Sequence, residues 1–170
     1  MEEKFTVGLI VSNHFGVLNR ISGLYSKRGY NIDSLAVGVT EDKRYSRLTI
    51  VSTGDEYMKD QVIKQLQKLH DVKMVTLFNN ETTVSVEHML IKLKTDNGNK
   101  AKISEFINAY GGKVMDFGDH YITAEITGNS EKVDKFIADI SGLGILELCR
   151  SGAISMIHGV DNMLSIKNLE

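Results

Sequence analysis

Six landmark residues in the first half of the chain recur 82 positions later (98 less 16) in the same order. They are Gly16, Ile21, Ser22, Leu24, Gly29 and Ile32, with counterparts at Gly98, Ile103, Ser104, Phe106, Gly111 and Val114. Landmarks kept in order at one offset are typical of a duplicated unit. The chain of 170 residues is therefore expected to hold two related domains.

The first copy predicts the order strand, helix, strand, strand, helix, strand. Apolar or branched residues recur as in half-buried strands over 5–11, 32–39, 45–52 and 72–78. Helical spacing of apolar residues covers 17–28 and 58–69. Asp55 is placed to cap the second helix, and Gly29 to end the first in a left-handed conformation. This order predicts a ferredoxin-like α+β fold, with two helices on one face of an antiparallel sheet.

The second copy is expected to repeat this plan. Its predicted elements are 84–94, 100–110, 113–117, 121–127, 131–140 and 145–157. Past the hairpin, Thr127 matches Thr53 at an offset of only 74, so the second hairpin is expected to be eight residues shorter (82 less 74), at 118–120. The predicted domains are residues 1–80 and 81–160, and residues 161–170 are expected to form a poorly ordered tail.

The charge balance argues against a nucleic-acid or anionic membrane partner, because 20 basic residues face 22 acidic ones. The predicted third strand also lacks the glycine and paired aromatics of the RNA-recognition fold. No apolar segment approaches the roughly 20 residues that span a bilayer. The amino terminus has no basic region followed by an apolar core. A soluble cytoplasmic protein is therefore expected.

The motifs of catalysis are missing from the sequence. It has no Gly-x-Ser-x-Gly elbow, no phosphate-binding loop and no His-Glu-x-x-His pair. The five histidines lack metal-ligand spacing and are interpreted as surface residues: His14, His70, His88, His120 and His158. Cys149, in a late apolar strand, is expected to be buried and inert. The sequence therefore predicts no active site and no metal site.

The polar turn before the first helix is the best candidate for a ligand site. A helix start leaves N–H groups unpaired at a positive dipole end, so a carboxylate fits there. Gly16 would let a ligand approach the backbone, and the amides of Asn13 and Asn31 suit a zwitterion. A purely structural interpretation stays open, in which Asn13 caps the helix, Gly16 serves its backbone angles and Asn31 shapes a turn.

Residues 16–35 read Gly-Val-Leu-Asn-Arg-Ile-Ser-Gly-Leu-Tyr-Ser-Lys-Arg-Gly-Tyr-Asn-Ile-Asp-Ser-Leu. Together with Ser-Arg-Leu-Thr-Ile at 46–50 and Gln-Leu-Gln-Lys-Leu at 65–69, this segment resembles the small regulatory subunit of acetolactate synthase (acetohydroxyacid synthase). Residues 89–93 and 150–152 support the resemblance more loosely in the second copy. It implies an amino-terminal ACT domain, a ligand-binding form of the ferredoxin-like fold, followed by the family's carboxy-terminal regulatory domain.

The resemblance also implies a role in the biosynthesis of valine, leucine and isoleucine. Such subunits associate with a separate catalytic large subunit, raise its activity and confer feedback inhibition by a branched-chain amino acid, usually valine. Thiamine diphosphate, Mg and FAD are expected only in that catalytic partner, and none in this chain, which would have no catalytic site of its own. A free-standing amino acid sensor of the ACT type and a small independent enzyme remain alternatives.

In that family the effector lies between the ACT domains of two chains, so a homodimer through the first domain is implied. Carried over by position, Asn13 and Gly16 would hold the amino and carboxylate groups, and Val17 and Leu18 would contribute N–H groups. The partner chain would supply Asn31 and Ile32.

Some positions depart from the family's usual pattern, namely Ser12, Phe15 and Tyr25. The large ring of Phe15 could reshape the pocket, so the choice among valine, leucine and isoleucine stays open. The second copy has Thr95 in place of Asn13 and Lys113 in place of Asn31. No equivalent amino acid site is expected there.

Overall fold

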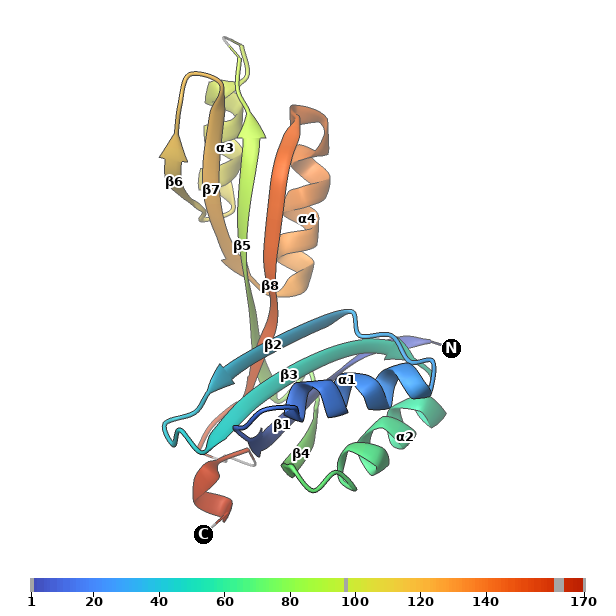
Figure 1. Ribbon diagram of the computed structural model, residues 1–170. Coiled ribbons are helices and arrows are strands. Elements are labelled where there is room, and N and C mark those ends of the chain that lie inside the picture. Colours follow the sequence, from blue (N-terminus) through green and yellow to red (C-terminus); the bar gives the residue numbers. More distant parts are fainter. Residues whose placement is uncertain (1, 97, 161–163, 170) are drawn as a thin grey trace. The chain divides into compact units, whose positions relative to one another are not determined.

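The computed structural model describes residues 2–96, 98–160 and 164–169 (Figure 1). The chain divides into two compact units, Met1–Val84 with Ala153–Glu170, and Ser85–Gly152. Each unit holds a four-stranded antiparallel sheet, with strand order β2-β3-β1-β4 in the first and β6-β7-β5-β8 in the second. The predicted α+β class, with two ferredoxin-like βαββαβ domains, is confirmed.

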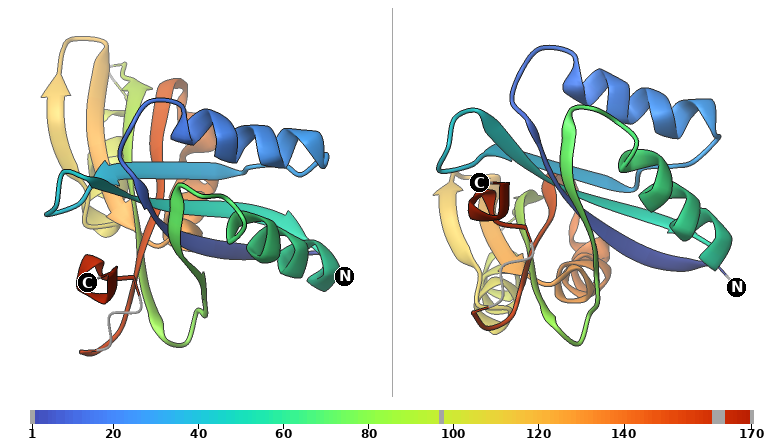
Figure 2. Two further views of the ribbon diagram at one scale, coloured as in Figure 1. Left: turned by 60° about the horizontal axis from the view of Figure 1, so that its bottom comes forward. Right: turned by 90° about the horizontal axis from the view of Figure 1, so that it is seen from below.

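The first unit contains every element predicted from the first copy. Its elements are β1 (Glu3–Ser12), α1 (Val17–Lys27), β2 (Ser34–Val39), β3 (Tyr45–Gly54), α2 (Glu56–Leu66) and β4 (Val72–Phe78). Both helices cover the same face of the sheet (Figure 2). The alternating residues Val7 and Leu9 of β1 are fully buried against Ile21 of α1 and Val62 of α2. The apolar faces predicted from the strand and helix patterns therefore pack together in one core.

The second unit repeats the plan as the 82-residue offset predicted. Its elements are β5 (Thr83–Lys94), α3 (Lys100–Ala109), β6 (Lys113–Phe117), β7 (Tyr121–Gly128), α4 (Ser130–Ile140), the 3₁₀ turn η1 (Ser141–Leu143) and β8 (Ile145–Ile157). The short hairpin predicted at 118–120 joins β6 to β7. Met89, Ile91 and Leu93 of β5 pack against Ile103 of α3 and Phe136 of α4. This core is separate from that of the first unit.

The predicted helix ends are also confirmed. The Asp55 carboxylate accepts a hydrogen bond from the Met58 N–H at 2.7 Å and caps α2. Gly29 follows α1 with φ 69°, and its counterpart Gly111 follows α3 with φ 64°. These left-handed angles favour glycine, so the two glycines recur because both helices end in the same way.

The predicted division into 1–80, 81–160 and 161–170 differs from the structure at the carboxy-terminal segment, because the described residues 153–160 and 164–169 lie with the first unit. Leu164 is buried against Ile10 and Phe78, and residues 166–169 form the 3₁₀ helix η2 (Ile166–Leu169). The prediction of a poorly ordered tail stays a prediction: residues 164–169 are placed beside the first unit, and 161–163 and 170 lie outside the described residues.

The sheet of the first unit receives this segment on the face that carries Ile10 and Gly8. A side chain at Gly8 would collide with Leu164 and Phe78, so the glycine leaves the space that Leu164 fills. The guanidinium of Arg47 on β3 donates to the carbonyl oxygen of Ser155 at 2.7 Å and to that of Leu164 at 3.2 Å. Apolar contact and hydrogen bonds from the Arg47 side chain to main-chain carbonyl groups together hold the segment in place.

Cys149 is exposed, so the prediction of a buried thiol is wrong. The reason is topological: β8 is the edge strand of its sheet, and residues 146–151 of it are exposed despite their apolar content. None of the described helices is long and apolar enough to cross a membrane.

Candidate functional site

The candidate site lies in the loop between β1 and α1. Gly16 precedes the helix with φ 88° and ψ −9°, a left-handed conformation that a residue with a side chain adopts only under strain. The backbone angles of Gly16 therefore require a glycine, as the structural interpretation holds, and this leaves its proposed role toward a ligand untested. Apart from its two neighbours in the chain, none of the described residues has a heavy atom within 4 Å of the position where a Cβ would stand, so the backbone here is also open to approach.

Within the described part of the chain no side chain caps the start of α1 or of α3, whereas Asp55 caps α2 and Asn129 caps α4. Val17 is buried in the core and fixes the first turn of the helix, and Leu18 beside it is 46% exposed. The N–H groups of this turn carry the positive end of the helix dipole. The main-chain N–H groups of Val17 and Leu18 are therefore the ones that could hold an anionic group at this helix start.

Asn13 does not cap α1, contrary to the structural alternative. Its main-chain N–H donates to the carbonyl oxygen of Arg44 at 2.7 Å, and its side-chain amide donates to that of Lys43 at 2.9 Å. Its Oδ1 receives no hydrogen bond from the described part of the chain. The residue is thus held by the turn between β2 and β3, with an acceptor left for a ligand such as an ammonium group.

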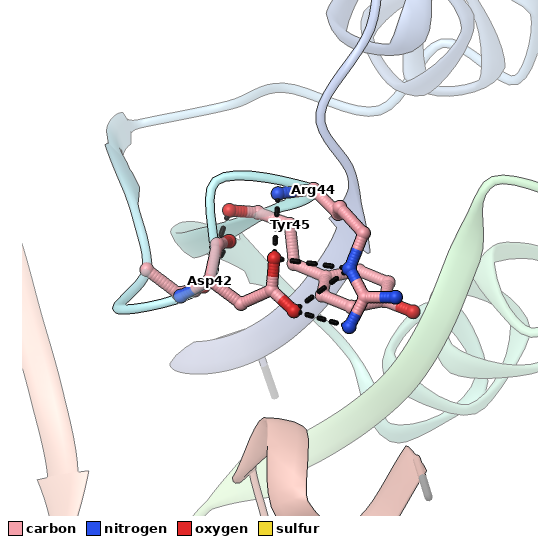
Figure 3. Close-up of polar contacts among 4 residues, drawn as sticks. Asp42, Arg44 and Tyr45 are labelled. Atoms are coloured by element: carbon pink, nitrogen blue, oxygen red, sulfur yellow. Dashed lines mark hydrogen bonds and ion pairs between the residues drawn. The ribbon is translucent and has the colours of Figure 1, made fainter.

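The β2–β3 turn that holds Asn13 is itself braced by Asp42 and Arg44, as Figure 3 shows. Arg44 donates its main-chain N–H to Asp42 at 2.9 Å, and its guanidinium donates to the same carboxylate at 2.8 and 2.5 Å. These bonds hold the pKa of Asp42 below its usual value. The guanidinium also lies 5.5 Å from the centre of the Tyr45 ring. The turn therefore presents its carbonyl groups in a fixed arrangement.

A second brace comes from the turn between α2 and β4. Asp71 is 4% exposed, its carboxylate contacts the guanidinium of Arg20, and its Oδ1 lies 3.0 Å from Nε2 of His14. Its carbonyl oxygen accepts from the Ser12 N–H at 2.8 Å. Burial would raise the pKa of Asp71, but His14 and Arg20 outweigh it and lower the pKa. The carboxylate therefore stays ionised and ties the loop to the domain.

This brace was missed by sequence reasoning. His14 and Asp71 are 57 positions apart, and His14 was interpreted only as a surface residue. Its side chain is 51% exposed, so that interpretation is right about exposure but incomplete about contacts. No local pattern links the two residues, since only the fold brings the α2–β4 turn beside the loop.

Asn31 and Ile32 lie beyond the C-terminal end of α1, in the segment that joins the helix to β2. Asn31 is exposed and donates to Asp33 at 2.7 Å, while Ile32 packs partly against the core. The helix between the two halves of the predicted site has 11 residues, or about 16 Å of length. The structure thus brings Asn13, Gly16, Val17 and Leu18 together, but not Asn31 and Ile32 with them in one chain.

The second unit keeps the scaffold of this loop without its amides. The Thr95 N–H donates to the carbonyl oxygen of His120 at 2.8 Å, as the Asn13 N–H does to Arg44. Thr95 is 1% exposed, and its hydroxyl points to the carbonyl of Asp119 at 3.4 Å. Its side chain is therefore used inside the protein, unlike the exposed amide of Asn13.

Comparison with known proteins assigns both halves of the chain. Residues 7–74 match the family described as AHAS small subunit-like ACT domain, and residues 86–159 match that described as small subunit of acetolactate synthase. The acetolactate synthase small subunit of Mycobacterium bovis is 38% identical over 154 residues, covering 91% of this chain and 92% of that protein. The chain belongs to the acetolactate synthase small-subunit family.

Other members of the family agree. A probable acetolactate synthase small subunit from Archaeoglobus fulgidus is 38% identical over 156 residues, covering 92% of this chain and 98% of that protein. The crystal structure of the acetolactate synthase small subunit from Thermotoga maritima matches with a TM-score of 0.86 and 32% identity, covering 94% of this chain and 99% of that one. The first unit is therefore an ACT domain of the small-subunit type.

Arg150, in the segment 150–152 that resembles the family, forms an ion pair with the buried Glu87 of the second unit. Arg150 donates to both oxygens of Glu87, at 2.6 and 2.7 Å, and to Asp134 of α4 at 2.7 Å. Glu87 is 4% exposed, and the hydrogen bonds from Arg150 lower its pKa despite the burial. Since these residues come from β5, β8 and α4, the pair joins an edge strand to the sheet and a helix.

Among the described residues, no three His, Cys, Asp or Glu side chains cluster as metal ligands.

Proposed function

We propose that this chain is the regulatory subunit of an acetolactate synthase and that it binds a branched-chain amino acid, with valine the first candidate. The observation that carries the proposal is the loop 13–16 in a chain whose two halves both match this family. An uncapped helix start, an open left-handed Gly16 and a braced Asn13 lie side by side there. These groups suit the carboxylate and ammonium of a free amino acid.

In the proposed complex, the loop of one copy and the start of β2 of another enclose the effector. Asn13 accepts from the ammonium group, while the backbone at Gly16 and the N–H groups of Val17 and Leu18 hold the carboxylate. Asn31 and Ile32 come from the second copy. The length of α1, about 16 Å, supports this division, because it is too long for one small amino acid to bridge within one chain.

The edge strand β2 supports a homodimer through the ACT domain. Among the described strands β3 is its one neighbour, so its other edge presents main-chain donors and acceptors that another strand could pair with. Leu35, Val37 and Val39 on this strand are 36%, 44% and 59% exposed. A second copy placed along β2 would cover these side chains and bring its own Asn31 toward the site.

The chain would act on a separate catalytic large subunit in the cytoplasm, in the biosynthesis of valine, leucine and isoleucine. Thiamine diphosphate, Mg and FAD would belong to that subunit. The effector can change the partner's activity only if it binds one arrangement of the subunits more tightly than another. Regulation then follows from linkage between the effector site and the contact with the large subunit.

Titration of the purified chain into its catalytic large subunit tests the role. We expect the rate of acetolactate formation from pyruvate to rise until every large subunit has bound a copy of this chain. Addition of valine should then lower that rate. An unchanged rate would favour a free-standing ACT-type sensor. Acetolactate formation by this chain alone with thiamine diphosphate would contradict the regulatory role altogether.

A further inference from the structure

Asp33, immediately before β2, holds the side-chain amide of Asn31 in one orientation. Nδ2 of Asn31 donates to Oδ1 of Asp33 at 2.7 Å. The other carboxylate oxygen, Oδ2, accepts from the hydroxyl of Thr53 on β3 at 2.7 Å. The main-chain N–H of Asp33 donates to the carbonyl oxygen of Val51 on the same strand at 2.8 Å. The carboxylate is therefore fixed to β3 through its backbone and its side chain, and it fixes Asn31 in turn.

The chemistry of the contact determines which end of the Asn31 amide stays available. A carboxylate only accepts hydrogen bonds, so Asn31 has to turn its NH₂ group toward Asp33 and its oxygen away. Among the described residues, none donates to that oxygen. Asn13 is arranged alike, because its NH₂ group donates to the carbonyl oxygen of Lys43. Both amides thus use a donor inside the protein and keep an acceptor for a ligand.

Two amide oxygens suit an ammonium group and oppose a carbonyl group. In the proposed complex, Asn13 of one copy and Asn31 of a second copy face the same ligand. An ammonium group carries three N–H donors for these acceptors. The 2-oxo acid with the same side chain has a carbonyl oxygen at that position, which can only accept. The amide of Asn31 could serve it by turning over, but that would break the hydrogen bond to the charged carboxylate of Asp33.

We propose that Asp33, supported by Thr53, is a positioning residue that makes the effector site select an α-amino acid against the 2-oxo acid with the same side chain. This inference rests on the proposed function and names the ligand class of the same site. Asp33 acts through Asn31 and needs no contact with the ligand. Selection against the 2-oxo acid comes from the acceptor that this compound leaves unpaired.

The test is isothermal titration of the full chain with valine and with 3-methyl-2-oxobutanoate, the 2-oxo acid that has the side chain of valine. The unmodified chain should bind valine at least about a hundredfold more tightly, as hydrogen bonds to a charged group imply. Asp33→Ala should bind valine about tenfold more weakly, without losing affinity for the 2-oxo acid, because the released amide of Asn31 can turn over. Thr53→Val, which removes the hydroxyl and keeps the shape, should act in the same direction but less.

Asp60→Ala is the matched control. It removes the same charge from an exposed position on α2, where Asp60 lies 3.6 Å from the ammonium group of Lys64, and it should keep both affinities. The same ratio of valine to 2-oxo acid affinity in Asp33→Ala as in the unmodified chain would overturn the proposal. Equal weakening of both ligands would also overturn it, since that is the effect of a residue that only supports the fold.

The side-chain NH₂ resonance of Asn31 provides a measurement that needs no effector. It is assigned in the nuclear magnetic resonance spectrum of the ligand-free chain as the signal that is missing from Asn31→Ala. We expect Asp33→Ala to shift this signal and Asp60→Ala to leave it in place; a signal unmoved by Asp33→Ala would overturn the orienting contact. If valine does not bind the unmodified chain, the proposed function fails, and this signal still decides separately whether Asp33 orients the amide.

Discussion

The side-chain amide of Asn13 donates to the main-chain carbonyl of Lys43 at 2.9 Å, which ties the loop before α1 to the turn between β2 and β3. The turn is stiffened by the Asp42–Arg44 pair, so the position of Asn13 is set by residues about 30 positions away. A ligand that needs the free oxygen of this amide meets it already oriented. Such preorganisation lowers the entropic cost of binding.

The conformation of Gly16 predicts the effect of a methyl group there. Gly16→Ala keeps φ near 88° only at a cost of about 1–2 kcal/mol, because a Cβ is strained in the left-handed region even where space is open. We expect chemical denaturation to show this loss, together with weaker valine binding. Gly23→Ala inside α1, where space is also open, is the control and should stabilise by up to about 1 kcal/mol. Equal effects of both substitutions would contradict the strain.

Removal of the buried Tyr25 hydroxyl is expected to stabilise the protein. The hydroxyls of Tyr25 and Ser52 are near each other in the core, yet neither makes a hydrogen bond within the described residues. Burial raises the pKa of Tyr25 to about 12. Tyr25→Phe should therefore raise the free energy of unfolding by about 1 kcal/mol at pH 7.

The same substitution should change the response to alkali. Because the folded pKa of Tyr25 is raised, the unfolded chain ionises this hydroxyl more readily, so the free energy of unfolding is unaffected by it below pH 10 and falls as the pH rises from 10 toward 12. The unmodified chain should lose stability over this range more steeply than Tyr25→Phe. Tyr57→Phe, at a 72% exposed site, should leave the profile unchanged. A destabilised Tyr25→Phe would show that the hydroxyl has a partner after all.

The ion pair between Glu87 and Arg150 predicts loss of stability in acid. The folded pKa of Glu87 is lowered, so its contribution is present above its ordinary value of 4.5 and is lost as the pH falls below it. Glu87→Gln should cost about 2 kcal/mol at pH 7, less than a fully buried pair because Arg150 is 32% exposed. It should also weaken the fall in stability between about pH 5 and 3.

A second glutamate provides the control for this prediction. Glu147 pairs with Lys92 at 2.7 Å but is 69% exposed, so solvent screens the pair. Glu147→Gln should leave the melting temperature unchanged at pH 7. Equal destabilisation by the two substitutions would mean that burial is not what gives the Glu87 pair its strength.

The carboxy-terminal segment predicts a contrast between two apolar residues. Leu164 is 6% exposed between Ile10 and Phe78, whereas Val160 is 97% exposed. Leu164→Ala should lower the free energy of unfolding by about 2 kcal/mol through lost burial and a cavity. Val160→Ala should have almost no effect. No change with Leu164→Ala in thermal denaturation would mean that the segment does not dock on the sheet in solution.

Much of the fold followed from local patterns. Alternating apolar residues in β1 and the helical spacing of apolar residues in α1 each indicate one buried face. The repeat at 82 positions predicted the same elements in the second unit. Leu164 could not be placed in this way, because a single apolar residue has no period. Its place depends on Gly8, Ile10 and Phe78, which come together only when the sheet has formed.

The candidate site was predictable where its signal is local. Asn13 and Gly16 mark a turn before a helix, and Asn31 follows the end of that helix, so sequence spacing named them as candidates, and the family resemblance supplied their proposed roles. The support from Asp71 was not predictable, since a buried carboxylate 57 positions from His14 has no signature of its own. Residues that hold a site often come from distant elements, as here from the α2–β4 turn.

Feedback inhibition in the reconstituted complex tests the central claim most directly. The catalytic large subunit is combined with the unmodified chain, with Asn13→Ala, or with Asn19→Ala as a control on the exposed side of α1, and acetolactate formation is measured against valine concentration. All three chains should activate the enzyme. Valine should inhibit the complexes of the unmodified chain and Asn19→Ala alike, whereas Asn13→Ala should need at least about tenfold more valine, as the loss of one hydrogen bond to a charged group implies. Inhibition of the Asn13→Ala complex at the same valine concentration as the unmodified one would contradict the assignment of this loop to the effector.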